Sequence, residues 1–163
     1  MKDIFKLFSL PQSFLINRSA LKAAFLSLQK QHHPDLVAIA STAPKPHMNI
    51  TSSEINEAFQ ILKDDLKRAQ YLLAFNHIHP AKVEQVVLMQ IMELTELIDE
   101  LHSENNLTKL GELQRLNTDS TDTCLRLLES SWQIRDYNKF AAETAKLSYY
   151  LRIKDNHFDN ADK

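Results

Sequence analysis

Apolar residues recur along most of the chain at spacings of three and four, the period of an amphipathic α-helix. A helix that ends near His32 carries one such face, formed by Leu21, Ala24, Phe25 and Leu28. A second helix begins after the capping-box pattern Thr51-Ser52-Ser53-Glu54 and carries Ile55, Ala58, Phe59 and Leu62. Two such helices joined by a polar segment predict an antiparallel hairpin, with Phe25 and Phe59 as its core aromatics.

Shorter helices complete the N-terminal half. The apolar stretch of residues 3–10 precedes Pro11 and predicts a short helix or turn, and a further helix is expected from about Leu66 to Phe75. At the start of that helix, Lys67 and Arg68 are expected to face water or the following domain. Asn17 or Ser19 is the expected cap of the first long helix.

The C-terminal half begins after the segment Asn76-His77-Ile78-His79-Pro80, of which we interpret residues 77–80 as a linker. Three helices are predicted beyond it, over about 81–103, 106–134 and 137–155, with breaks and caps at Asn105-Asn106 and Asp136. Residues 157–163 are expected to form a frayed tail. This division predicts an N-terminal domain over residues 1–76 and a C-terminal three-helix domain over residues 81–156.

The composition is typical of an all-α protein. One glycine among 163 residues disfavours strand-and-turn folds and phosphate-binding loops. The net charge of -2 indicates no general affinity for nucleic acid, and the single Cys124 excludes an intrachain disulfide or a multi-cysteine zinc site. No apolar run approaches the roughly 20 residues of a membrane span, and the N-terminus lacks a signal-peptide plan. We therefore expect a soluble, cytoplasmic protein without a membrane partner.

His33-Pro34-Asp35 directly follows the first amphipathic helix. Proline fixes its own φ and disfavours a helical conformation in the residue before it, so His33 is the expected helix end and Pro34 a rigid corner. Asp35 then places an acceptor-only carboxylate beside an imidazole that titrates near neutral pH. Taken alone, the tripeptide is typical of an ordinary loop at the end of a helix. The two flanking amphipathic helices favour a loop with a function.

The helix predicted from Ala81 has an unusual outer face when it is plotted at about 100° per residue. Its core stripe comprises Val83, Val87, Ile91, Leu94, Ile98 and Leu101. The opposite side is formed by Met89, Met92, Glu93, Glu96 and Glu100. Methionine adapts to irregular partner surfaces and charge lies towards the rim of an interface, so this face predicts a partner that carries Lys or Arg. The alternative is that the methionines contact a neighbouring helix or the first domain.

The last predicted helix contributes one further candidate to this surface. Tyr149 lies away from the apolar positions Phe140, Thr144, Leu147 and Leu151, and it can join the outer face. Tyr150 competes with it for that role, and the sequence leaves both possibilities open.

The N-terminal order of a helix, His33-Pro34-Asp35, a long loop and the capped helix of Ile55-Asn56-Glu57-Ala58-Phe59 resembles a J-domain. With Arg68-Ala69-Gln70-Tyr71-Leu72-Leu73 and the three C-terminal helices, residues 1–155 resemble the HscB-type J-domain co-chaperones of iron–sulphur cluster biogenesis. Lys146-Leu147-Ser148-Tyr149 also has a counterpart in that family. Departures are Leu36, where a lysine is common, Ser9, where glycine is common, and the poorly matching helix 106–134.

The resemblance implies an adaptor that is not an enzyme and that needs no cofactor or metal. Its J-domain is expected to stimulate the ATPase of a DnaK/HscA-type chaperone, and its C-terminal bundle to deliver an IscU-type cluster scaffold protein. The implied chaperone contacts are His33, Pro34, Asp35, Lys22 and Lys30. The implied scaffold contacts are Leu88, Met89, Met92, Glu93, Glu96, Glu100 and Tyr149.

Three other functions fit the sequence less well. Zinc or copper binding would draw on five histidines that have no cysteine or paired carboxylate nearby, namely His32, His33, His47, His77 and His79. A hydrolase using His33 and Asp35 lacks a nucleophile elbow or oxyanion loop in this glycine-poor chain. A J-domain co-chaperone for another client is the main alternative, and the outer stripe of residues 88–100 discriminates against it.

Overall fold

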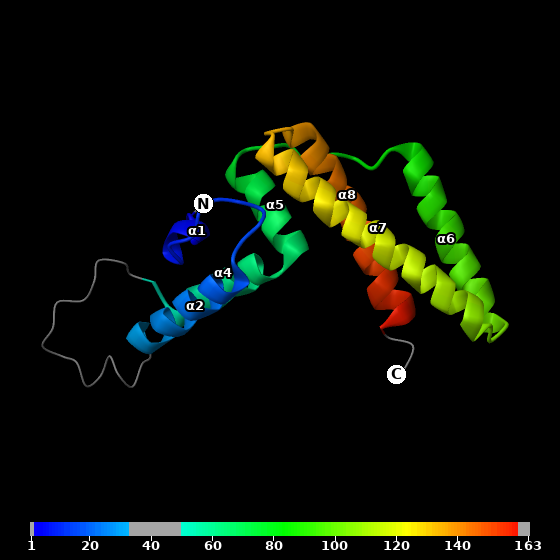
Figure 1. The fold of residues 1–163 in the computed structure, drawn as a ribbon, viewed down its shortest axis with the longest axis horizontal. Helices are drawn as coiled ribbons and strands as arrows, with labels where there is room; N and C mark the ends of the chain where they lie inside the picture. Colours follow the sequence, from blue (N-terminus) through cyan, green and yellow to red (C-terminus); the bar gives the residue numbers. More distant parts are fainter. Residues whose placement is uncertain (1, 33–49, 160–163) are drawn as a thin grey trace, which may run out of the picture. The chain divides into compact units, whose positions relative to one another are not determined.

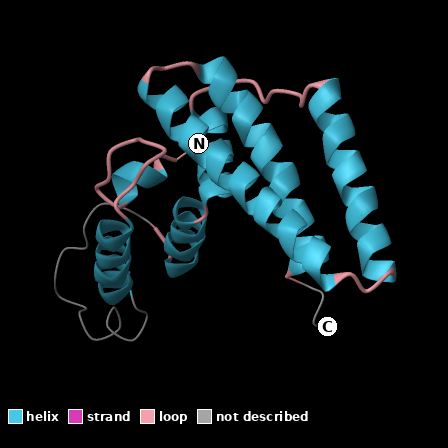
Figure 2. Ribbon diagram, turned by 45° about the vertical axis from the view of Figure 1, so that its right-hand side comes forward, coloured by secondary structure: helices cyan, strands magenta, loops and turns pink. Residues whose placement is uncertain are grey.

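The computed structural model describes residues 2–32 and 50–159, and the regular secondary structure of this part is entirely helical (Figures 1 and 2). The elements are α1 (Ile4–Leu7), α2 (Arg18–His32), α4 (Ser52–Lys63), α5 (Asp65–Phe75), α6 (Gln85–Ser103), α7 (Leu107–Gln133), α8 (Tyr137–Ile153) and the π-helix η1 (Lys154–Phe158). The all-α prediction is confirmed. The chain divides into two compact units, Met1–Phe75 and Asn76–Lys163. The tripeptide His33-Pro34-Asp35 lies outside the described residues, as do Leu36 and His47.

In the N-terminal unit, α2 and α4 form the predicted antiparallel pair. The rings of Phe25 and Phe59 stack with their centroids 4.1 Å apart, which confirms the expected aromatic contact. At one end of the pair, the hydroxyl of Ser52 donates to the carbonyl oxygen of His32 at 2.9 Å. This bond joins the start of α4 to the end of α2.

Side-chain caps explain where these two helices begin. The Thr51 hydroxyl accepts from the Glu54 amide at 3.2 Å, and the Thr51 amide donates to the Glu54 carboxylate at 2.8 Å. This reciprocal pair is the predicted capping box, and it satisfies amides that an α-helix leaves unpaired at its first turn. For α2 the cap is Asn17, whose side-chain oxygen accepts from the Ala20 amide at 2.9 Å.

Arg68 is buried within the N-terminal unit, and the expectation that this residue lies on the surface of the unit was wrong. Its side chain is buried, and it donates from Nε to the carbonyl oxygen of Phe14 at 2.7 Å and from Nη1 to that of Leu62 at 2.6 Å. It also pairs with the Asp65 carboxylate. Buried backbone carbonyls require donors, and the forked guanidinium supplies two of them from one position. Its neighbour Lys67 is exposed, as expected.

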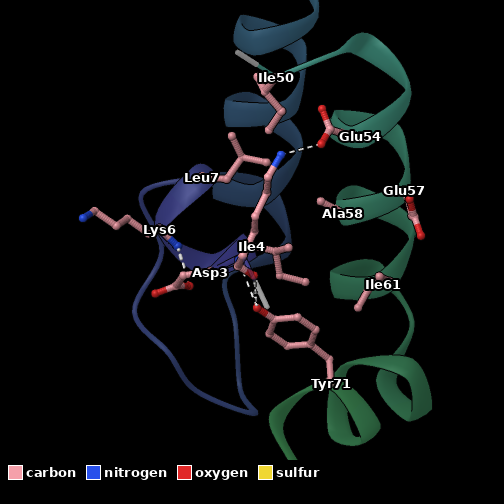
Figure 3. A pocket seen from close by; sticks show the side chains of 11 residues that line it. Asp3, Ile4, Lys6, Leu7, Ile50, Glu54, Glu57, Ala58, Ile61 and Tyr71 are labelled. Atoms are coloured by element: carbon pink, nitrogen blue, oxygen red, sulfur yellow. Dashed lines mark hydrogen bonds and ion pairs between the residues drawn. The ribbon is translucent and has the colours of Figure 1, made fainter. Parts of the chain in front are cut away.

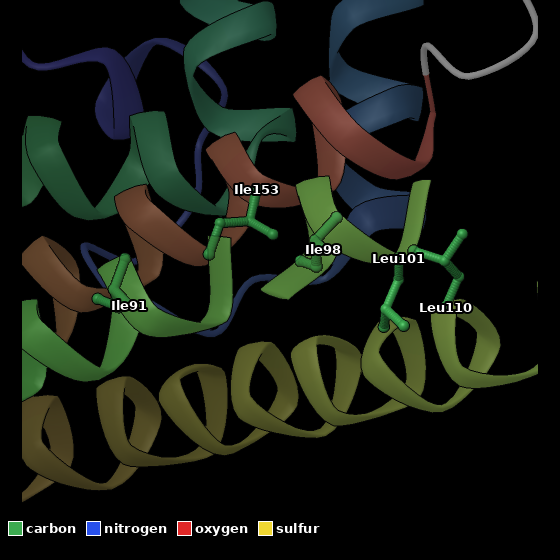
Figure 4. Close-up of a cluster of buried hydrophobic side chains, with 5 residues drawn as sticks. All are labelled: Ile91, Ile98, Leu101, Leu110 and Ile153. Atoms are coloured by element: carbon green, nitrogen blue, oxygen red, sulfur yellow. The ribbon is translucent and has the colours of Figure 1, made fainter. Parts of the chain in front are cut away.

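The C-terminal unit is built on the long antiparallel pair α7 and α8, against which α6 packs. Three residues of the predicted core stripe of α6 are buried and meet one residue from each of the other helices (Figure 4). The members of this cluster are Ile91, Ile98, Leu101, Leu110 and Ile153. Asn106 caps α7 and Asp136 caps α8, at the breaks that the sequence predicts.

Helix α6 begins at Gln85, four residues later than the sequence predicts. Glu84 has extended backbone torsion angles, with ψ of 142°, and makes no side-chain cap bond. A longer helix would also place Lys82 in its first turn, where the partial positive charge of the helix dipole disfavours a cation. Val83 therefore precedes the helix and is half-buried.

The tail was expected to fray from residue 157, but His157 and Phe158 belong to a helical turn. Residues Lys154–Phe158 continue α8 as a turn of π-helix. Phe158 packs against the core cluster, and Nδ1 of His157 lies 3.2 Å from a carboxylate oxygen of Asp99 on α6. An aromatic side chain with an apolar surface to cover, together with a polar contact to α6, holds this end in place.

Candidate partner-binding surfaces

The outward side of α6 carries two large apolar side chains in contact with solvent. Met89 is 53% exposed and Met92 is 55% exposed. The three glutamates predicted to share this side are exposed as well. We call this surface the α6 outer face, defined as Met89, Met92, Glu93, Glu96 and Glu100. Within the described part of the C-terminal unit, no neighbouring helix covers the methionines.

The α6 outer face carries only negative charge. Helix α6 contains four acidic residues and no Lys or Arg. Among the described residues, none forms an ion pair with Glu93, Glu96 or Glu100. Asp99, the fourth acid, differs because it lies beside His157. The uncompensated carboxylates around two exposed methionines suit a partner with an apolar patch and basic surroundings.

Leu88 and Tyr149 are the two remaining predicted scaffold contacts. Both are half-buried, and the Tyr149 ring packs against the core cluster with the Arg152 guanidinium 5.7 Å from its centroid. Tyr150 also packs against the cluster, and it lines a cavity between α7 and α8 together with Ser120 and Cys124. Burial raises the pKa of Tyr150. Tyr150 thus contributes to the α7–α8 interface, and the role of Tyr149 as a scaffold contact stays a prediction.

Two of the five predicted chaperone contacts lie on α2 of the N-terminal unit. Lys22 and Lys30 are exposed, and a spacing of eight residues places them on one side of the helix. Leu26 lies between them and is 49% exposed. The last residue of α2, His32, directly precedes His33-Pro34-Asp35 in the sequence. The two lysines therefore lie on the helix that directly precedes the tripeptide in the sequence.

A pocket of about 660 Å³ lies in the N-terminal unit between α1, α4 and α5 (Figure 3). Its wall is mainly apolar and includes Leu7, Ile50 and Ile61. The Tyr71 hydroxyl donates to the Lys2 carbonyl oxygen at 2.7 Å and accepts from the Ile4 amide at 3.1 Å, so it is already engaged. Neither a nucleophile with its base nor a set of metal ligands lines the pocket, and it offers no catalytic arrangement.

Cys124 is not a reactive thiol. It is buried, and burial together with the nearby Glu143 carboxylate raises its pKa to about 12. The Glu143 carboxylate is itself buried and lies 2.9 Å from the ammonium of Lys146. Since the thiolate is the nucleophile and the metal ligand, this environment keeps the sulfur inert. No group of three or more metal-ligating side chains occurs among the residues that the structure describes.

Within residues 2–32 and 50–159, no helix has both the length and the apolar character needed to cross a bilayer.

Comparison with known proteins defines the class of this protein. Residues 3–71 match the family model of the DnaJ domain, and residues 83–156 match that of the HSCB C-terminal oligomerisation domain. The chain is therefore a J-domain protein with an appended helical domain. Its similarity to individual proteins extends over nearly its whole length, and on that evidence the chain belongs to the HscB family of co-chaperones.

Two relatives and one solved structure illustrate this similarity. The chain is 34% identical to a Co-chaperone protein HscB homolog from Acinetobacter baumannii (strain SDF), over 97% of this chain and 89% of that protein. It is 31% identical to the homolog from Azoarcus sp. (strain BH72), over 98% and 93% of the two chains. The structure of chaperone HscB from Vibrio cholerae matches with a TM-score of 0.84 and 29% identity, over 99% and 98% of the two chains.

Proposed function

We propose that this chain stimulates the ATPase of a DnaK/HscA-type chaperone and delivers an IscU-type iron–sulphur scaffold protein to it. The outcome is transfer of the cluster and maturation of iron–sulphur proteins, in the cytoplasm. Membership of the HscB family supports the co-chaperone role. The observation that carries the scaffold-binding part of this proposal is the pair of exposed methionines among exposed glutamates on α6.

In the scaffold half, Met89 and Met92 act as apolar anchors that lose their water on binding. Desolvated anchors at the centre of an interface carry most of its binding energy. Glu93, Glu96 and Glu100 border them and pair with Lys or Arg of the scaffold. Leu88 and Tyr149 widen the contact towards α8. The buried residues of α6 hold its backbone in place, so the face is presented without prior rearrangement.

In the chaperone half, the carboxylate of Asp35 pairs bidentately with an arginine of the ATPase. Such a contact biases a two-state element of the chaperone only if it differs in strength between the two states. Pro34 fixes the corner of the loop, and His33 shapes it. Lys22 and Lys30 steer the docking of α2 onto an acidic patch.

The two activities are assigned to different parts of the chain. Residues 1–76 form the J-domain, residues 77–80 the linker and residues 81–156 the scaffold-binding domain. The division into two compact units supports this assignment. Each unit also encloses its own apolar residues, as the stacked Phe25 and Phe59 and the separate C-terminal cluster illustrate.

The scaffold half is tested with the double substitution Met89→Ala and Met92→Ala in the full-length chain. Calorimetric titration with purified IscU-type scaffold is expected to show a loss of roughly 1 to 2 kcal/mol, because the anchors are truncated. The melting temperature should barely change, since both side chains are exposed. The matched control is Leu107→Ala with Leu116→Ala, two leucines of α7 that are more than half exposed.

Unchanged affinity in the methionine variant, with unchanged melting, contradicts the scaffold assignment. If the ATPase of the chaperone is still stimulated, that result favours a J-domain co-chaperone for another client. An equal loss of affinity in the leucine control shows that the contact is not specific to α6.

A further inference from the structure

Helix α6 exposes more apolar surface than the two methionines alone. Of the ten exposed large hydrophobic side chains among the described residues, four belong to this helix. They are Val86, Met89, Met92 and Leu97. Val86 is 58% exposed and Leu97 is 42% exposed, and neither is a member of the core stripe or of the α6 outer face.

The two additional residues lie on one flank of the helix. At about 100° per residue, Val86 and Leu97 project roughly 60° and 80° away from Met89, and Met92 projects roughly 60° in the opposite sense. The exposed apolar residues therefore span an arc of about 140°, which is the sum of those two extremes. An arc this wide is covered by a concave surface and only partly by a flat one. Helices that bind in this way use anchors in the i, i+3, i+4, i+7 pattern.

We propose that Val86 and Leu97 form an apolar flank that extends the α6 outer face, and that α6 docks as a helix into an apolar groove of the scaffold protein. This inference rests on the proposed function. Basic residues border the groove, because Glu93 projects between Met89 and Val86, about 20° from Val86, and has no ion-pair partner among the described residues. The scaffold thus contacts more than the outer face of the helix.

Continuity of the surface identifies the occupant as the same partner that binds the methionines. Val86 comes one helical turn before Met89, and Leu97 comes one turn after Glu93, so the flank and the outer face share an edge along the helix. A second protein cannot cover the flank without meeting the first. A second copy of this chain is disfavoured for a different reason, since it would bring the exposed glutamates of two α6 helices together.

The flank is tested with Val86→Ser and Leu97→Ser in the full-length chain. The probe is the purified IscU-type scaffold without its cluster, titrated by calorimetry. We expect the Kd to rise at least fivefold, whereas the control Leu107→Ser with Leu116→Ser should change it less than twofold. A Kd within twofold of the parent in the flank variant, while Met89→Ala with Met92→Ala raises it, overturns the flank and leaves the proposed function standing. If the methionine variant also binds like the parent, the proposed function fails.

Methyl NMR of the unmutated chain provides a second test that does not depend on the folding of a variant. On addition of the scaffold, the methyl signals of Val86 and Leu97 should shift or broaden together with those of the methionines. The signals of Leu107 and Leu116 should stay unchanged. Perturbation of Met89 without any change at Val86 and Leu97 overturns the proposal. A parent chain that sediments as a dimer, and a flank variant that sediments as a monomer, would assign the flank to self-association and overturn it as well.

Discussion

The guanidinium of Arg68 lies over the ring of Phe14, with Cζ 5.0 Å from the ring centroid, while its Nε donates to the carbonyl oxygen of the same residue at 2.7 Å. A second donor, Nη1, reaches the carbonyl oxygen of Leu62. One buried side chain on α5 thereby joins the end of α4 to the segment that precedes α2. Burial lowers the pKa of Arg68, and the nearby Asp65 carboxylate opposes this effect.

We expect Arg68→Lys to destabilise the N-terminal unit by about 2 to 4 kcal/mol, because an ammonium cannot span both carbonyl groups and buried acceptors are left unpaired. Urea unfolding followed by circular dichroism measures the change. The matched control is Lys67→Arg at the exposed neighbouring position, where an effect within about 0.5 kcal/mol is expected. Parent-like stability of Arg68→Lys would show that the hydrogen bonds to Phe14 and Leu62 contribute little.

The capping box of α4 predicts a dependence of stability on pH. Hydrogen bonding to Lys2, whose Nζ lies 2.5 Å from Oε1 of Glu54, and to the Thr51 amide lowers the pKa of Glu54 from 4.5 to about 2. A carboxyl group whose pKa is lower in the folded state contributes its full stabilisation above the unfolded value of 4.5. That contribution is lost as the pH falls from 4.5 towards 2.

Glu54→Gln should remove this acid-dependent contribution. Melting temperatures of parent and variant, measured over that pH range in low salt, should differ at the upper end and converge towards the lower end. An NMR titration of Glu54 in the parent checks the cause directly. A titration midpoint at the ordinary value of a glutamate would show that neither Lys2 nor Thr51 stabilises the carboxylate in solution.

Several features of this fold that depend on local sequence were predicted correctly, although the start of α6 was placed four residues too early. The capping box involves residues three apart in the sequence. The contact of Phe25 with Phe59 follows from the apolar faces of two successive helices that pack as an antiparallel hairpin. Arg68 was misplaced because its partner Phe14 is 54 residues away, and helical periodicity carries no information about a distant carbonyl. The helical turn at residues 157 and 158 was missed for a similar reason, since it depends on the contact of His157 with α6 and on the packing of Phe158 against the core cluster.

For the candidate surfaces, too, helical periodicity predicted some exposed residues and missed others. The period of a helix was sufficient to place Met89 and Met92 opposite the core, where the structure finds them exposed. It was not sufficient to recognise Val86 and Leu97, because residues near the border between the core stripe and the outer face are buried or exposed according to how the neighbouring helices pack. The functional roles of these residues, and that of Asp35, stay predictions.

Asp35→Asn should abolish stimulation of the chaperone ATPase. The substitution keeps the shape of the side chain and removes its charge, so the bidentate pair with an arginine is lost. The fold should be unaffected, because loop residues rarely contribute to the core. Steady-state ATP hydrolysis by the purified DnaK-type chaperone, with scaffold present, measures the effect, and Asp3→Asn is the matched control in the same unit. Full stimulation by Asp35→Asn would refute the role of the tripeptide.

Charge reversal at Glu96 distinguishes steering of the scaffold from anchoring. Glu96 is exposed and projects within about 20° of Met89, at the centre of the α6 outer face. Exposed charges at an interface change the association rate more than the dissociation rate. We therefore expect Glu96→Lys to lower the association rate constant about threefold to tenfold at low ionic strength, with little change in melting temperature.

Near 1 M salt, where the screening length is about 3 Å, the association rates of parent and variant should converge. Stopped-flow measurement of association across a salt series checks this expectation, and Glu112→Lys, an exposed acid of α7, is the control. A parent-like association rate at low salt would show that the scaffold approaches α6 without help from its negative charge, and an equal slowing in the control would assign the effect to net charge alone.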